Sequence, residues 1–179
     1  LAGHGVMQSG AERDGRLLAE RAGIPIAVTL LGIGAVPASH PLNLGMMGMH
    51  GEAFVNHAIQ QADLLIALGM RFDDRVTGNL KTYAPTAKKI HVDIDRAELN
   101  KNVRVDVAIA KDLKSALDEW MPLVKKGDRR AWLEAIDVLN EPTLGTYPVF
   151  KFEHERLTRL YTDVVGSVRE VAPHWVAFL

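Results

Sequence analysis

The sequence predicts an α/β fold, with an open parallel sheet of about six strands and helices on both of its faces. Three observations indicate this fold. Short apolar runs, several of them rich in β-branched residues, have the length of buried strands. Segments with apolar residues at helical spacing separate these runs, as in parallel βαβ units. A dense charge cluster at residues 69–78 follows one apolar run, as ligand-binding loops do at the carboxyl ends of parallel strands.

The first strand–helix–strand unit lies at the start of the chain. Residues 1–5 resemble the end of a strand that runs into a glycine turn, so we expect the chain to begin inside a larger protein. A helix is expected at about 11–22, because its apolar residues share one face. Gly23 has the place of a helix C′ residue, with Pro25 beyond it. The β-branched run 24–31 then predicts a buried strand.

The middle of the chain contains a long irregular segment, residues 32–51, which is rich in Gly, Pro and Met. Long loops inside a domain are usually functional or disordered, and the apolar content of this one predicts an ordered binding loop. A helix is expected at about 51–61, where four apolar residues share one face. The apolar run 64–68 predicts a buried strand that leads into the charged loop 69–78.

The next part of the chain continues the alternation. We expect a turn at 83–86, a strand at 89–95, a short helix at 96–100, a strand at 103–108 and a helix at 113–124 with Asp112 as its N-cap. Strict alternation in the strand 89–95 predicts that Ile90, Val92 and Ile94 face one way and His91, Asp93 and Asp95 the other.

The chain divides into a central α/β domain, residues 1–127, and a helical C-terminal extension, residues 128–179. In the extension we expect an amphipathic helix at 130–140 and a linker at 141–148. Apolar residues at helical spacing predict a further helix at 157–171.

Composition excludes several classes of protein. The 179 residues are 47% hydrophobic and 24% charged, as in an average soluble globular protein. The formal net charge is −1 and no basic block is present, so no nucleic-acid partner is expected. The chain has no cysteine, which excludes disulfides and thiolate metal sites and fits a reducing, cytoplasmic compartment. No apolar run reaches about 18 residues and there is no signal peptide, so no membrane association is expected.

The first candidate site is Gly3-His4-Gly5. Glycines after a first strand let the backbone approach a phosphate. The full G-x-G-x-x-G spacing is absent, and a tight turn that needs positive φ explains the two glycines equally well.

The charged loop 69–78 is the second candidate. Arg71 and Arg75 can grip phosphates or stack on a flat ring. With Asp73 and Asp74 they can equally form a solvated ion-pair network of little energetic weight. Chemistry alone leaves the two interpretations equal.

The remaining candidates are an acidic strand end and a methionine-rich segment. Asp93 can accept hydrogen bonds from ribose or ribityl hydroxyls. Asp95 has the spacing of a capping box with Glu98, which favours a local structural role. Methionines in the segment 46–50 can pack against a flat ring, but more often fill a core. The histidines show no metal-ligand spacing and no Ser/His/Asp triad signature is present, so we predict binding features without a catalytic set or a metal site.

Five motifs occur in order along the chain: Thr29-Leu30-Leu31-Gly32-Ile33-Gly34, Leu44-Gly45-Met46-Met47-Gly48-Met49-His50-Gly51, Asp63-Leu64-Leu65-Ile66-Ala67-Leu68-Gly69, Arg71-Phe72-Asp73-Asp74-Arg75-Val76-Thr77-Gly78 and His91-Val92-Asp93-Ile94-Asp95. Together they closely resemble the central domain of the acetolactate synthase catalytic large subunit. The resemblance extends from Leu1 to about Leu123. The motif at 71–78 is the most specific to this family.

The resemblance implies a Rossmann-like central domain with a six-stranded parallel sheet that binds FAD, a cofactor generally regarded as structural in this family. The flanking domains bind thiamine diphosphate and Mg²⁺ across a dimer interface. The expected partners are therefore these domains, a second copy of the chain and, in the full enzyme, a regulatory small subunit. The family condenses two pyruvates, or pyruvate and 2-oxobutyrate, with decarboxylation of one of them, in branched-chain amino-acid biosynthesis.

The resemblance also implies individual FAD contacts. They fall at Gly3, His4, Gly5, Thr29, Leu30, Met46, Met47, Met49, His50, Gly69, Met70, Arg71, Asp73, Arg75, Asp93, Ile94, Asp112 and Leu113. Asp74 and Arg75 resemble residues near the active-site entrance. His4 and Lys111 replace glycines that the family usually has, and His4 is expected to crowd the pyrophosphate.

Two parts of the family's machinery are absent from the sequence. The glutamate that activates the thiamine ring and the G-D-G…N motif for Mg²⁺ belong to the other domains, so we expect no catalytic residue here and no activity of the chain alone. The alternative is a cofactor-free structural or oligomerisation domain of another thiamine-diphosphate enzyme. An NAD-dependent deacylase-like protein is a weaker alternative, because its catalytic His motif and zinc cysteines are missing.

Overall fold

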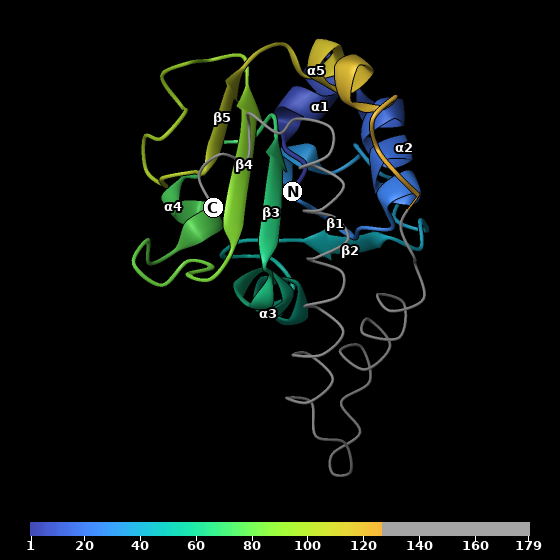
Figure 1. Cartoon of the computed structure of the whole chain (residues 1–179). Coiled ribbons are helices and arrows are strands. Elements are labelled where there is room, and N and C mark those ends of the chain that lie inside the picture. The colour runs from blue at the N-terminus through green and yellow to red at the C-terminus, as the bar shows by residue number, and fades with distance from the viewer. Residues whose placement is uncertain (127–179) are drawn as a thin grey trace.

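The computed structural model describes residues 1–126 (Figure 1). The expected helices at 130–140 and 157–171, the linker at 141–148 and the rest of the C-terminal extension lie outside the described residues. They stay predictions, as does the domain boundary at residue 127.

The strands of the described chain form one parallel sheet. They are β1 (Ile26–Val28), β2 (Asn43–Met46), β3 (Leu64–Leu68), β4 (Lys88–Asp93) and β5 (Val107–Ala110). β1 pairs with β2, and β3, β4 and β5 pair in that order. Ala2 joins the two groups, because it forms parallel bridges to both Val28 and Leu68. The predicted open parallel sheet is confirmed, with five strands and a strand position at Ala2.

The order of the strands creates a switch point beside Ala2. From Ala2 the chain moves outward to β1 and β2, then returns to β3 on the other side of Ala2 and continues outward to β4 and β5. In sheets of this kind, ligands bind outside the carboxyl ends of the strands where the order reverses. The turns after Ala2 and after Leu68 lie at that place.

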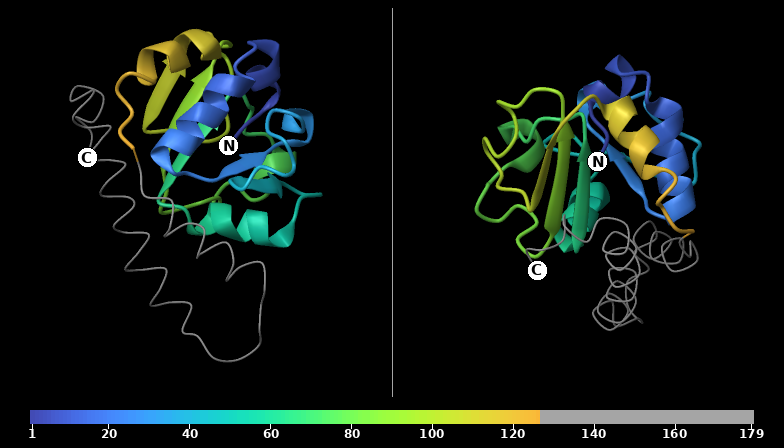
Figure 2. Two further views of the ribbon diagram at one scale, coloured as in Figure 1. Left: turned by 90° about the vertical axis from the view of Figure 1, so that its right-hand side faces the viewer. Right: turned by 45° about the horizontal axis from the view of Figure 1, so that its top comes forward.

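Helices cover both faces of the sheet, as predicted. They are α1 (His4–Gln8), α2 (Glu12–Ala22), α3 (Ala53–Gln61), α4 (Asp74–Thr77) and α5 (Leu113–Trp120), with a 3₁₀ turn, η1, at Leu30–Gly32. Figures 1 and 2 show α1, α2 and α5 gathered on one side of β3, β4 and β5, with α4 on the other. Contacts among α1, α2 and α5 join these three helices into one layer.

Two apolar clusters fill the spaces between sheet and helices. The first contains Val6, Leu18 and Leu117 from the three-helix layer. The second contains Val55 from α3 and Phe72 from the loop after β3. β3 contributes to both clusters, since Leu68 belongs to the first and Leu65 and Ala67 to the second. A strand buried on both faces reads as a continuous apolar run, which is why β3 was predicted with its observed bounds.

Several expected elements were found where the sequence indicated them. α2 occupies the predicted 11–22 segment, and Gly23 ends it in the left-handed conformation with φ of 69°. α3 occupies most of 51–61. Asp112 is the N-cap of α5, since its side chain accepts a hydrogen bond from the Ser115 N–H.

The amino-terminal half differs from the prediction in three places. The strand expected at 24–31 ends at Val28, because Thr29 Oγ1 accepts a 3.0 Å hydrogen bond from Gly32 N and turns the chain into η1. The segment 32–51 is not wholly irregular, since β2 lies within it. β2 lacks β-branched residues and contains Gly45 at φ of 101°, so its sequence gave no strand signal. The glycine turn at 3–5 opens α1, a helix that was not predicted.

The later elements also shift. The prediction of a short helix at 96–100 is wrong, because those residues form a turn. The strand expected at 103–108 lies instead at Val107–Ala110, as β5. Val103 is buried in the second cluster, and Asp106 N bonds to Lys89 O at 2.9 Å just before β5 begins to pair with β4. The strand at 89–95 begins one residue earlier and ends at Asp93, and α5 ends at Trp120. α4 lies inside the charged loop.

Candidate functional site

The candidate site is the carboxyl edge of the sheet at the switch point, where two backbone turns touch. Gly3 N donates to Leu68 O at 3.0 Å and Gly5 N donates to Gly69 O at 2.9 Å. A Cβ at Gly3 would lie 2.3 Å from Gly69 O, and one at Gly5 would lie 2.7 Å from the Gly69 Cα. No side chain fits in that space, so both positions require glycine.

This contact changes the explanation of the Gly3-His4-Gly5 motif. Gly3 has φ of −106° and Gly5 is not among the glycines with positive φ, so the tight-turn explanation is wrong. The close approach that requires the glycines is to the protein's own backbone at Gly69. The His4 side chain is exposed on the first turn of α1 and takes no part in this contact.

The backbone of the charged loop is held from four directions. Its carbonyl oxygens accept hydrogen bonds as follows: Gly69 O from Gly5 N at 2.9 Å, Met70 O from His91 Nε2 at 2.7 Å, Phe72 O from Asn102 Nδ2 at 2.8 Å and Arg75 O from Met49 N at 2.7 Å. The loop is therefore a fixed platform, although its charged side chains reach into solvent.

The four charges of this loop are only loosely paired with one another. The Arg71–Asp73 and Arg75–Asp74 nitrogen–oxygen distances are 3.7 and 3.8 Å, which exceed hydrogen-bond length. Asp73 has a local role, since its side chain accepts a 3.2 Å hydrogen bond from Val76 N and caps α4. Within residues 1–126 neither arginine side chain makes a hydrogen bond, and the Arg71 and Arg75 side chains are 62% and 70% exposed. The two guanidinium groups are thus free to bind an anion or a flat ring.

The acidic end of β4 lies at the same edge. Asp93 Oδ1 accepts a 2.9 Å hydrogen bond from Asp95 N, while its Oδ2 lies 3.9 Å from His91 Nε2. Asp95 accepts a 2.8 Å hydrogen bond from Ala97 N, which closes a turn. The expected capping box with Glu98 is wrong, because no helix follows and Glu98 pairs with Lys101. Ile94 is 75% exposed between the two acids. Asp93 therefore retains one carboxylate oxygen for a ligand hydroxyl.

The other expected contacts fall into two groups. Met47, Met70 and Leu113 are buried, so these residues can offer a ligand only backbone atoms. Leu30, Met49 and His50 are exposed, Met46 is half-buried in β2, and Thr29 Oγ1 is engaged in η1.

Two residues at the carboxyl end of β5 are engaged locally. The Asp112 carboxylate accepts hydrogen bonds from Ser115 N and Oγ, and the backbone bond above all holds its pKa below the usual range. Lys111 is paired with Glu119 on α5 and bonds through its backbone N to Asp93 O at 3.1 Å. Its side chain is thereby drawn toward α5.

Two buried polar residues of β4 did not stand out in the sequence. Lys89 is 8% exposed and its Nζ donates to Ala84 O at 2.7 Å and Ala87 O at 2.9 Å. His91 is completely buried. Burial lowers the pKa of both side chains, more strongly than nearby carboxylates raise it. The alternation of β4 places both residues on the face that carries Asp93. This alternation was the only feature of the sequence that pointed to Lys89 and His91 as part of the site.

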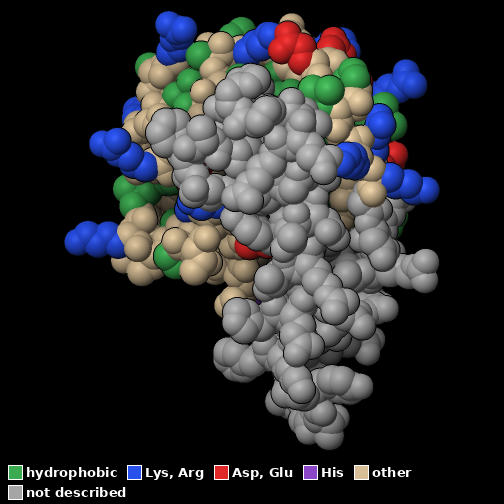
Figure 3. Space-filling view, viewed as in Figure 1, with side chains coloured by type: hydrophobic (Ala, Val, Ile, Leu, Met, Phe, Trp, Pro, Cys, Tyr) green, Lys and Arg blue, Asp and Glu red, His purple; other side chains and the backbone are tan. Residues whose placement is uncertain are grey.

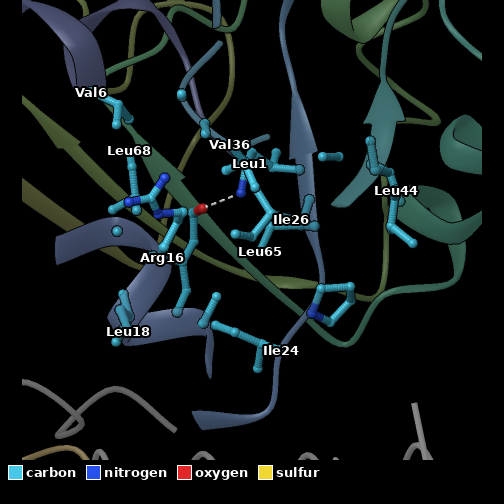
Figure 4. A pocket seen from close by; sticks show the side chains of 18 of the residues that line it. Leu1, Val6, Arg16, Leu18, Ile24, Ile26, Val36, Leu44, Leu65 and Leu68 are labelled. Carbon is cyan, nitrogen blue, oxygen red and sulfur yellow. Dashed lines mark hydrogen bonds between the residues drawn. The ribbon is translucent and has the colours of Figure 1, made fainter. Parts of the chain in front are cut away.

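A cavity of about 120 Å³ lies elsewhere, at the amino ends of the strands. Figure 4 shows its apolar lining from α2, β1 and β3 around Leu1. The Leu1 backbone nitrogen donates to Ile66 O at 2.7 Å. The candidate residues at the carboxyl edge do not line this cavity, which is far smaller than the roughly 300–1,000 Å³ of usual ligand pockets.

The described surface adds little to the candidate site. On the part of the face in Figure 3 that the grey atoms leave visible, Lys and Arg side chains appear at several places. Among residues 1–126, no group of three His, Asp or Glu side chains is placed to hold a metal ion. No helix in the same part of the chain has the length and apolarity to cross a membrane.

The fold and site together define a doubly wound α/β domain with a ligand edge at its switch point. The model of the thiamine pyrophosphate enzyme central domain matches residues 1–120, so the chain belongs to that family. It is similar to a probable acetolactate synthase large subunit of Methanocaldococcus jannaschii, with 42% identity over 176 residues, or 96% of this chain and 29% of the relative. It is also similar to the acetolactate synthase isozyme 1 large subunit of Escherichia coli, with 49% identity over 121 residues, or 68% of this chain and 22% of the relative. The chain thus spans less than a third of the length of these relatives.

Proposed function

We propose that the chain is the central domain of an acetolactate synthase large subunit and that its carboxyl edge binds FAD. The observation that carries this proposal is the set of uncommitted groups on the fixed loop after β3. The Arg71 guanidinium and one oxygen of Asp93 lack hydrogen-bond partners among the described residues. Arg71 follows β3, which borders the switch point at Ala2, and Asp93 ends the next strand, β4. Dinucleotides bind at such points in doubly wound sheets.

The residues present fit an extended dinucleotide. Arg71 and the backbone around Gly3 and Gly5 would hold the pyrophosphate, because a guanidinium matches phosphate oxygens. Asp93 and Asp112 would accept hydrogen bonds from hydroxyls of the adenosine half. Exposed apolar side chains, among them Leu30 and Met49, would pack against a flat ring.

The parent enzyme would condense two pyruvates, or pyruvate and 2-oxobutyrate, with decarboxylation. FAD would support structure there, since this reaction has no net oxidation or reduction. Thiamine diphosphate and Mg²⁺ would bind to flanking domains of the parent chain, which would act in the cytoplasm as an oligomer, with a regulatory subunit as a further partner. Asp74 and Arg75 would face one of those flanking domains.

Titration of FAD into the full-length protein tests the proposal. Arg71→Ala should weaken FAD binding about tenfold to a hundredfold, because one charge-assisted hydrogen bond contributes roughly 1.5–3 kcal/mol. Arg104→Ala is the matched control, since this exposed arginine lies two residues before Asp106, whose carboxylate bonds at the amino end of β4. Equal affinities of the two variants would contradict the role of Arg71. An absence of FAD binding by the wild type would contradict the cofactor itself.

A second candidate function is a cofactor-free structural domain that positions its neighbours. The observation that favours it is the contact of Gly3 and Gly5 with Gly69, which accounts for both glycines without a phosphate. A full-length enzyme that is colourless, releases no flavin on denaturation and remains active without FAD would support this candidate over the first.

A further inference from the structure

His91 has a position unlike that of any other histidine in the described chain. It lies in the middle of β4 with no exposed surface. Its ring packs against that of Phe72 in a T-shaped arrangement, with the ring centroids 5.0 Å apart. A polar ring enclosed among apolar groups is costly unless it is hydrogen-bonded, so its partner identifies what it does.

The partner of His91 is the backbone of the charged loop. Its Nε2 lies 2.7 Å from Met70 O, and a carbonyl oxygen only accepts hydrogen bonds, so the ring carries its proton on Nε2. Nδ1 is buried and has no hydrogen-bond partner among the described residues, as suits an unprotonated nitrogen of a neutral ring. Burial also lowers the pKa of His91, which keeps the ring neutral at pH 7.

The hydrogen bond fixes the peptide that precedes Arg71. The residue before it is already held, since Gly69 N donates to Val92 O at 2.9 Å and Gly69 O accepts from Gly5 N. With Met70 O bound as well, the direction in which Arg71 leaves the sheet is set. The same Nε2 lies 3.9 Å from Asp93 Oδ2. One ring therefore lies between the arginine loop and the acidic end of β4.

We propose that His91 is a positioning residue for the cofactor site, which acts through the Met70 carbonyl to fix Arg71 relative to Asp93. This inference rests on the proposed function, because it assigns His91 to the edge where FAD would bind. His91 itself touches no ligand in this arrangement, and its effect on binding is indirect.

Two variants of similar polarity, His91→Gln and His91→Asn, distinguish a role of His91 in positioning the loop from a role in filling the interior. The amide nitrogen of Gln reaches the place of the imidazole Nε2, whereas that of Asn reaches only the place of Nδ1. In the full-length protein, His91→Gln should keep the FAD dissociation constant within about threefold of wild type, and His91→Asn should raise it roughly tenfold. Equal affinities of the two variants would overturn the proposal.

A control on the same strand removes effects of stability. Lys89→Met disturbs a buried polar group two residues away, but its Nζ holds Ala84 and Ala87 instead of the charged loop. This variant should lose stability and keep the wild-type FAD affinity. A loss of affinity in Lys89→Met equal to that in His91→Asn would overturn the specific role of His91.

Ring ¹⁵N NMR gives a readout that does not depend on FAD. The wild type should show His91 as a neutral ring with a slowly exchanging proton on Nε2. A proton on Nδ1 in the neutral ring would overturn the link to Met70. If the wild type binds no FAD, the proposed function fails, while the NMR result still decides whether His91 holds the loop.

Discussion

At the amino edge of the sheet the basic side chain of Lys89 binds the protein's own backbone, whereas at the carboxyl edge the basic side chains of Arg71 and Arg75 reach into solvent. Lys89 Nζ donates to two backbone carbonyls, and the Asp106 carboxylate accepts from Lys88 Nζ at 3.0 Å and Lys89 N at 2.8 Å. Arg71 and Arg75 make no such bonds within residues 1–126, although their backbone is firmly held. Polar groups that are satisfied internally support the fold, and those left free on a fixed backbone are available to a ligand.

β4 contains both kinds of polar residue on a single face. Lys89 stabilises the amino edge, because its Nζ donates a hydrogen bond to Ala84 O in the turn before β4. His91 serves the carboxyl edge through Met70, and Asp93 ends the strand with one carboxylate oxygen uncommitted. Four changes would break or sharpen this difference between the edges.

The largest effect is expected from Gly3→Ala. The new Cβ would lie 2.3 Å from Gly69 O, and the backbone on either side has no room to move. We expect a loss of more than about 3 kcal/mol in the free energy of unfolding, or no folding at all, because overpacking of rigid groups costs at least this much. Gly10→Ala is the control: it has φ of 65° but nothing within 4 Å, so it should cost only about 1–2 kcal/mol. Chemical denaturation measures both, and equal losses would show that the turns do not touch.

Lys89→Met should have the next largest effect on stability. It leaves the Ala84 and Ala87 carbonyls unsatisfied in the interior, at a cost of about 2–4 kcal/mol in the free energy of unfolding. Lys88→Met, which removes a half-exposed ion pair with Asp106, should cost less than about 1 kcal/mol. If the two losses were the same, Lys89 would be no more structural than its neighbour.

Acid should weaken the fold through His91. Burial lowers its folded-state pKa below the ordinary 6.5, although Asp93 and Glu98 act in the opposite direction. The unfolded chain therefore binds the proton more readily, so the stabilisation is present above pH 6.5 and is lost as the pH falls below it. The slope for one proton is at most about 1.4 kcal/mol per pH unit. Denaturation between pH 7.5 and 5 should show a shallower dependence in His91→Gln than in wild type, and an identical slope would contradict the assignment.

The smallest effect is expected from Asp73→Ala. It removes the N-cap of α4 and should cost about 1 kcal/mol in the free energy of unfolding. Asp73→Asn keeps the acceptor oxygen and loses the charge that faces Arg71, so its stability should stay within about 0.5 kcal/mol of wild type. A change in FAD affinity in Asp73→Asn would show that the carboxylate also serves the ligand, while equal stability losses in the two variants would exclude the capping role.

Sequence patterns located the elements whose signals were local. The continuous apolar run of β3, the helical spacing of α2 with Gly23 behind it, and the Asp112 cap of α5 depend on neighbouring residues, and the structure confirms all three. β2 could not be found in this way, because its strand state depends on pairing with β1 and not on its own residues. The segment 96–100 was expected to be a helix with Asp95 at its start, but the Asp95 side chain only closes a turn with Ala97 N and no later residue continues helical bonding.

By itself, the sequence determined the class of fold, the position of the charged loop and the family that its motifs resemble. Periodicity, turn residues and short contiguous motifs indicate those features, and each of these signals depends on residues close together in the sequence. Only the tertiary structure decided why Gly3 and Gly5 are glycines, since the constraint is the backbone of Gly69, far away along the chain. It also decided that His91 faces Met70, because the contact depends on how the loop after β3 folds back over β4. Contacts of this kind join segments distant in sequence, and no local pattern specifies them.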